Sequence, residues 1–211
     1  LSTQIKMFEL GNLGANCYII HDTTNDAIII DPGDQSQAVC NYIAEKKLNV
    51  KYILATHVHF DHIFGVGYFK LKYPSAQVLC HQADANMWQK QVKTAQQFQI
   101  KAPTSFKDSK TDGFLSDSLQ FGQTNIKILH TPGHTQGSVC FYFEQEKMCF
   151  SGDTLFAQGI GRTDFEGGSE QQMAKSIQFL KKNVDEKAII YPGHGGSASQ
   201  KQAIGYAEMM I

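Results

Sequence analysis

The amino-acid sequence predicts a mixed α/β (α+β) protein in which two β-sheets face each other and helices cover their outer faces. Short runs rich in β-branched and aromatic residues alternate with longer segments whose apolar residues recur at helical spacing. This order of strands and helices occurs in two halves of the chain that match each other. Two such halves can bury their apolar faces by stacking one sheet on the other.

The first half contains a predicted β-hairpin followed by alternating helices and strands. Residues 16–22 (NCYIIHD) and 26–31 (DAIIID) are the hairpin strands, and the turn-forming TTN joins them. The other predicted elements of this half are a helix over 36–48, a strand over 51–56, a helix over 65–73, a strand over 76–81 and a helix over 83–100.

The second half follows a polar stretch, residues 101–113, whose turn signals predict a mobile loop and a candidate gate. The predicted elements of this half are strands over 125–130, 138–144 and 147–152, a helix over 170–183, a strand over 188–193 and a terminal helix over 198–211. No repeat or linker interrupts the sequence, so we expect residues 1–211 to form a single domain.

Composition and charge narrow the classes of function. The 211 residues are 42% hydrophobic and 18% charged with a net charge of −1, which disfavours a nucleic-acid partner because such proteins carry a basic surface. No apolar run approaches the roughly 20 residues that span a bilayer, and the N-terminus lacks a secretory pattern. The five cysteines indicate buried free thiols in a reducing compartment. We therefore expect a cytoplasmic protein, with an organellar matrix as the alternative, and no membrane partner.

Ligand-type side chains follow several of the predicted strands. After the strand over 51–56 comes THVHFDH (56–62), which has three histidines and an aspartate within seven positions. Three later strands are followed by similar residues, namely His134 in TPGHT, Asp153 in SGDTLF and His194 in PGHGG. Imidazole and carboxylate groups are common ligands of zinc and iron. Because functional sites are often built on loops at strand ends, the four loops predict a metal centre.

The spacing of the first cluster favours two metals over one. Residues two apart in an extended segment point the same way, so His57, His59 and Asp61 can face one side. His62 follows directly and would point toward a neighbouring position. Two metals that lie a few ångströms apart fit this arrangement better than a single ion.

The motifs resemble those of the metallo-β-lactamase fold superfamily. THVHFDH, TPGHT, SGDTLF and PGHGG occur in this order, and together with IIIDPG they extend the resemblance over nearly the whole chain. Within the superfamily the chain resembles the glyoxalase II branch of hydroxyacylglutathione hydrolases, in its short single-domain type. The resemblance implies a four-layer αββα sandwich with the metals at the shared edge of the two sheets.

The resemblance also implies a ligand set for two divalent metal ions, most simply zinc, with iron or manganese as alternatives. The implied ligands are His57, His59 and His134 for the first metal, Asp61, His62 and His194 for the second, and Asp153 as a bridge between them. Asp31 and Thr56 are candidates for outer partners that orient the ligating histidines. A turn role before Pro32 is the alternative for Asp31.

Three further histidines match no motif of the superfamily. His21, His81 and His130 also lie at the ends of predicted strands. We expect them to be surface residues or hydrogen-bonded residues of the core.

A site of this kind predicts hydrolysis. Two metals lower the pKa of a shared water and polarise a carbonyl, so a hydroxide that bridges them can attack, and Asp61 can orient it. A thiolate leaves readily without a strong general acid, and no serine or cysteine lies in a recognisable nucleophile setting. We therefore predict a metallohydrolase that cleaves a small-molecule thioester, with S-lactoylglutathione or a similar hydroxyacyl-glutathione as substrate.

Arg162 is the single arginine in a chain with eighteen lysines. It lies in GIGRTDFEGGS, where larger glyoxalase II proteins tend to carry a basic residue that contacts the substrate, so the resemblance implies a substrate-binding role. A guanidinium can hold a carboxylate with two hydrogen bonds, either on the substrate or on Asp164 to organise the loop. Because the sequence continues for only 17 residues after His194, we expect a short member without the helical extension with which larger members grip glutathione.

Persulfide dioxygenases are the alternative from another class of enzyme. They share the fold, hold one iron with residues that match His57, His134 and Asp153, and oxidise glutathione persulfide. They typically continue the equivalent of His194 with an acidic and an aromatic residue, whereas this chain reads PGHGG. A β-lactamase proper is also disfavoured, because members of that branch usually carry cysteine or histidine where Asp153 stands.

Overall fold

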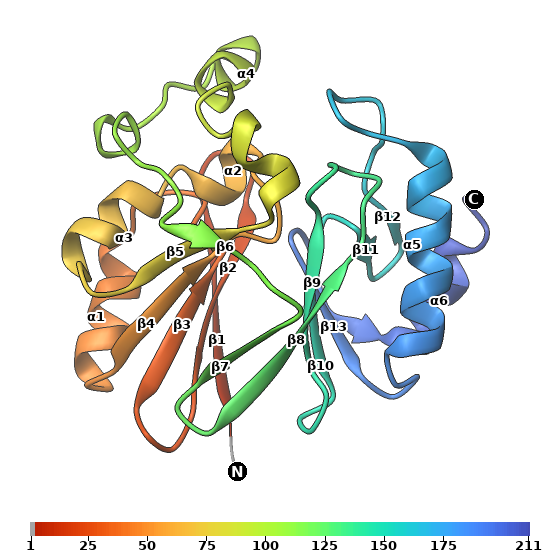
Figure 1. Cartoon of the computed structure of the whole chain (residues 1–211), viewed down its shortest axis with the longest axis horizontal. Coiled ribbons are helices and arrows are strands. Elements are labelled where there is room, and N and C mark those ends of the chain that lie inside the picture. The colour runs from red at the N-terminus through yellow and green to blue at the C-terminus, as the bar shows by residue number, and fades with distance from the viewer. Residues whose placement is uncertain (1–2) are drawn as a thin grey trace.

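The computed structural model describes residues 3–211 and contains two six-stranded β-sheets packed face to face (Figure 1). Helices cover the outer face of each sheet, so the layers follow the order helix, sheet, sheet, helix. The αββα architecture predicted from the sequence is therefore confirmed.

The first sheet combines antiparallel and parallel strands. The pairs β1–β2 and β2–β3 are antiparallel, and the pairs from β3 to β6 are parallel. In spatial order its strands are β1 (Gln4–Leu10), β2 (Ala15–His21), β3 (Asp26–Ile30), β4 (Asn49–Leu54), β5 (Gln77–Cys80) and β6 (Gly113–Phe114). The parallel connections run through α1 (Gln37–Glu45) and α3 (Val66–Lys72), which pack on the outer face.

The second sheet is antiparallel apart from the parallel pair β10–β13. In spatial order its strands are β14 (Ala198–Ser199), β13 (Ile189–Pro192), β10 (Met148–Gly152), β9 (Val139–Phe143), β8 (Thr124–His130) and β7 (Ser118–Phe121). A separate small hairpin of β11 (Leu155–Phe156) and β12 (Gly159–Ile160) follows β10. The outer face is covered by α5 (Glu170–Asn183) and α6 (Gln200–Ala207).

Alternating side chains of the strands build separate cores on the two faces of each sheet. In β2 and β3, Tyr18 and Ile28 point into the space between the sheets, whereas Ile19 and Ile29 pack beneath the helices. Both strands are thus buried on both faces, which explains why their sequences are almost continuously apolar. All five cysteines are buried and free, as predicted.

The prediction of one helix over 83–100 is wrong. The segment forms a 3₁₀ helix, η1 (Gln82–Met87), then a turn, then the short helix α4 (Gln91–Gln97). The chain breaks here because both Asp84 and Trp88 turn inward to polar partners, and the indole N–H of Trp88 donates to Ser109 Oγ (3.2 Å).

Further segments differ from the prediction, and the strands β1 and β7 were not predicted at all. The predicted loop over 101–113 contains a 3₁₀ turn, η2 (Thr104–Phe106), that Phe106 anchors in the core. The terminal segment 198–211 begins with β14, and its helix ends at Ala207. A one-turn helix, α2 (Phe60–Ile63), was not predicted. None of the helices described within residues 3–211 has the length and hydrophobicity of a membrane-spanning segment.

Candidate metal centre

The seven predicted ligands lie together at one edge shared by the two sheets. Four loops bring them there, after β4, β8, β10 and β13. The first of these loops runs into α2, which carries Asp61 and His62 (Figure 1). Parallel strands end at the same edge of a sheet, which is why loops far apart in the sequence meet here.

The first cluster consists of His57, His59 and His134, whose ring nitrogens lie within 4.8 Å of one another. His59 Nδ1 is 2.8 Å from His134 Nε2, and His134 Nδ1–H donates to the carbonyl of Arg162 (2.7 Å). Burial and the neighbouring imidazoles lower the pKa of His57 well below its ordinary value and that of His59 to about 3. Both rings are therefore neutral at pH 7, the state in which imidazole binds a metal.

The second cluster consists of Asp61, His62 and His194, whose ligand atoms also lie within 4.8 Å of one another. His194 Nε2 is 3.1 Å from Asp61 Oδ2. Burial alone would lower the pKa of His62, but Asp153 and Asp61 raise it to about 10. A divalent metal that binds here must displace the proton that this ring holds in the metal-free protein.

Asp153 lies between the two clusters. Its Oδ2 is 3.7 Å from His134 Nε2 and 3.6 Å from His194 Nε2, and its Oδ1 is 3.4 Å from His62 Nε2. Within residues 3–211, His57 Nε2, His62 Nε2 and Asp153 Oδ1 are buried without a hydrogen-bond partner. Buried polar atoms are rarely left in this state. Three such atoms that converge from both clusters fit two metal ions that share Asp153.

The carboxylate of Asp31 and the hydroxyl of Thr56 set the orientation of two of these rings. Asp31 accepts hydrogen bonds from Thr56 N (2.7 Å), Thr56 Oγ1 (2.6 Å) and His62 Nδ1 (3.0 Å). Because the Thr56 hydroxyl donates to Asp31, it accepts from His57 Nδ1 (3.0 Å). Because Nδ1 of each ring is engaged in this way, His57 and His62 both direct Nε2 toward the site.

Asp84 is a buried residue of the site that the sequence interpretation missed. Its carboxylate accepts hydrogen bonds from Val58 N (3.3 Å), Thr135 Oγ1 (2.7 Å) and Gly137 N (2.6 Å). It thus joins the loop that carries His57 and His59 to the loop that carries His134. A signal was available, because an aspartate four residues after a buried parallel strand lies near the edge where the ligands meet.

The three histidines that match no motif lie outside both clusters. His21 Nε2 is 3.1 Å from Tyr42 Oη, and His81 Nδ1 accepts from Ala83 N. His130 bonds to a backbone carbonyl and stacks on His81 with ring centroids 4.1 Å apart. These contacts agree with the surface and hydrogen-bonded roles expected from the sequence.

A cavity of about 260 Å³ opens over the two clusters. Its lining residues are Leu13, His59, Phe60, Asp61, Thr94, Phe98, His134, Asp153, Phe156, Gly161, Arg162, Phe165 and His194. The segment 101–113, predicted as a candidate gate, contributes none of the described lining residues. The wall on that side is formed by α4 and the residue that ends it, through Thr94 and Phe98.

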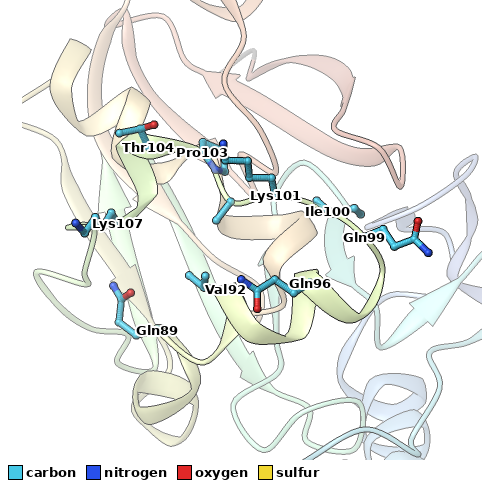
Figure 2. Close-up of a pocket in the computed structure, with 10 residues that line it drawn as sticks. Gln89, Val92, Gln96, Gln99, Ile100, Lys101, Pro103, Thr104 and Lys107 are labelled. Atoms are coloured by element: carbon cyan, nitrogen blue, oxygen red, sulfur yellow. The ribbon is translucent and has the colours of Figure 1, made fainter.

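A larger hollow of about 590 Å³ lies on the other side of α4 (Figure 2). Its described lining residues include glutamines and lysines, such as Gln96 and Lys101, but no histidine, cysteine or carboxylate. The smaller cavity is therefore the candidate active site, because only it, of these two, is lined by histidine and aspartate side chains.

Two facing sheets between helices, with histidine and aspartate clusters at their shared edge, define a candidate metal-binding protein of the αββα class. Residues 10–194 match the Metallo-beta-lactamase superfamily. The chain belongs to this superfamily.

Curated and solved relatives extend over most of the chain. Over 180 residues it is 33% identical to the hydroxyacylglutathione hydrolase GloC of Haemophilus influenzae, and the aligned region covers 85% of each chain. The crystal structure of the B3 metallo-beta-lactamase BLEG-1 superposes with a TM-score of 0.87 at 29% identity, over 99% of this chain and 100% of that one. The crystal structure of TTHA1623 in a di-iron-bound form superposes with a TM-score of 0.86 at 25% identity, over 97% of this chain and 99% of that one.

Proposed function

We propose that this metallohydrolase cleaves a thioester, with S-lactoylglutathione or a similar hydroxyacyl-glutathione as substrate. The observation that carries the proposal is the pair of clusters joined by Asp153 at the floor of a small cavity. The name of the GloC relative supports a glutathione thioester as the substrate class. We propose a small-molecule partner and neither a nucleic-acid nor a membrane partner.

The seven clustered side chains would hold two divalent metal ions. His57, His59 and His134 would bind the first, Asp61, His62 and His194 the second, and Asp153 both. Bound metals of this kind lower the pKa of a water molecule and polarise a carbonyl oxygen. Zinc suits nitrogen and carboxylate ligands, and iron is the alternative because the similar TTHA1623 was solved in a di-iron-bound form.

The residues of the cavity position the reactants. Asp61 lines the cavity with its Oδ2 held 3.1 Å from His194 Nε2, so its carboxylate can accept a hydrogen bond from an attacking water. Burial raises the pKa of Asp61, whereas the neighbouring His62 and His194 lower it. The two histidines outweigh burial and keep this pKa well below its ordinary value. Asp61 therefore remains an acceptor across the physiological range.

Arg162 contributes through its backbone and through the shape of its loop. Its carbonyl accepts from His134 Nδ1, and its guanidinium donates to both oxygens of Asp164 (2.6 Å each). The guanidinium also lies 4.0 Å from the ring centroid of Phe165. We therefore favour the loop-organising role for this arginine, because direct binding of a substrate carboxylate would compete with Asp164.

The second cluster favours the hydrolase over a persulfide dioxygenase. A single iron on His57, His134 and Asp153 would leave the buried Nε2 of His62 without a partner. The glycines after His194 also differ from the acidic and aromatic residues typical of those enzymes.

The test is release of free thiol from S-lactoylglutathione by metal-loaded protein, with chelator-stripped protein and His59→Ala as controls. We expect hydrolysis by the loaded protein alone, since His59 is a ligand of the first cluster. Equal turnover by metal-depleted His59→Ala would refute the proposal.

A further inference from the structure

The cavity over the metal clusters has an aromatic wall beside His59. The ring centroid of Phe165 is 5.6 Å from that of His59 and 6.3 Å from that of Phe98. Phe98 in turn lies 5.5 Å from Phe60. The side chain of Phe98 is 41% exposed although it is large and apolar, so a ligand in the cavity would gain contact with it.

A second apolar wall stands beside His194, across the cavity. Phe156 has its ring centroid 6.5 Å from that of His194. Leu13, from the turn between β1 and β2, lines the same cavity and is 44% exposed. A carbonyl over the metal clusters would thus have apolar surface on both sides.

The charge and the volume of the cavity also favour a small apolar group next to the reacting carbonyl. Arg162 is the only lysine or arginine among the described residues that line the cavity, and Asp164 neutralises it. The volume of about 260 Å³ lies below the roughly 300–1,000 Å³ of common ligand pockets. The cavity therefore encloses only the part of the substrate next to the reacting carbonyl.

From this geometry we infer that the hydroxyacyl group of the substrate carries an apolar alkyl or aryl chain larger than the methyl group of lactoyl, and that this chain packs against Phe98 and Phe165. This inference rests on the proposed thioester hydrolysis and adds the class of acyl group. Because the cavity is small, the thiol part of the substrate extends out of it.

The first test measures binding without turnover. S-methylglutathione and S-hexylglutathione are thioethers that cannot be hydrolysed, and they differ only in apolar chain length. By titration calorimetry on metal-loaded protein we expect the hexyl compound to bind at least tenfold more tightly, since each methylene that becomes buried contributes about a fourfold gain. Equal affinities would overturn the inference.

The second test measures kcat/KM for S-acetyl-, S-butyryl-, S-hexanoyl- and S-lactoylglutathione. We expect the value to rise from acetyl to hexanoyl by at least tenfold, with lactoyl near acetyl. Phe98→Ala should reduce the hexanoyl-to-acetyl ratio about fivefold or more. Phe179→Ala is the matched control, because Phe179 is 40% exposed on α5 and does not line the cavity.

The outcomes separate this inference from the proposed function. Hydrolysis with a flat or falling dependence on chain length would overturn the apolar acyl group and leave thioester hydrolysis standing. No hydrolysis of any thioester, together with tighter binding of the hexyl compound, would overturn the proposed function and support the apolar pocket.

Discussion

Replacement of Asp84 by alanine should destabilise the protein through the two loops that this carboxylate joins. The substitution removes the acceptor of Thr135 Oγ1 and Gly137 N at 2.7 and 2.6 Å, and of Val58 N at 3.3 Å. A hydrogen bond to a charged group contributes roughly 1.5–3 kcal/mol. Burial raises the pKa of Asp84 in spite of these bonds, so part of that gain is offset by desolvation. We expect a net loss of about 3 kcal/mol in the free energy of unfolding.

The assay is urea unfolding of metal-free protein, followed by zinc titration of the folded variant. Asp108→Ala is the matched control, because Asp108 is exposed and surface substitutions usually change stability by less than about 0.5 kcal/mol. Asp84 contacts no ligating side chain but joins the two loops that carry His57, His59 and His134, so we expect zinc affinity to fall by about tenfold, the lower end of the effect of losing a direct partner of a ligand. A variant within about 1 kcal/mol of the parent and with unchanged zinc affinity would refute the role of Asp84.

Three further predictions follow from the site. Gly193→Ala should lower kcat/KM at least about tenfold, because an added Cβ overlaps Asp153 Oδ1. The circular dichroism spectrum should not change. Full activity of this variant would contradict the central position of Asp153. Thermal unfolding of metal-free protein should show greatest stability near pH 6.5. The pKa of His59 is lowered to about 3, so folding becomes less favourable as the pH falls below 6.5 and the unfolded chain takes up a proton there. The pKa of His62 is raised to about 10, so its stabilising charge is lost as the pH rises above 6.5. A melting temperature that rises steadily to pH 10 would contradict this. Arg162→Lys should raise KM equally for anionic and neutral thioesters, and a larger effect on the anionic ones would assign Arg162 to the substrate.

The candidate metal ligands could be identified from the sequence because residues of ligand type stand at the ends of predicted strands. His57 and His59 stand at alternate positions after a buried strand, and three of the other ligands follow later strands. The expectation that Asp61 faces the same side as these two histidines is wrong, because the helix α2 places Asp61 with His62 and His194. The sheet topology then brings these loops to one edge. The outer partners Asp31 and Thr56 were accessible for the same reason, since they flank the ends of two neighbouring parallel strands.

The cavity walls could not be predicted in the same way. Leu13, Phe98, Phe156 and Phe165 come from four separate segments, and none of them belongs to a periodic apolar pattern. The two-residue strands β6, β11, β12 and β14 are too short to show alternation. The break in the helix predicted over 83–100 depends on tertiary partners such as Thr135, which lies 51 positions from Asp84.

Titration of zinc into metal-free protein, with bound metal and thiol release from a glutathione thioester recorded together, tests the two-metal hydrolase most directly. We predict saturation at two equivalents per chain and full activity only when both have bound, with His194→Ala reduced to about one equivalent. Saturation of the parent protein at one equivalent, or full activity at the first equivalent, would contradict the two-metal site.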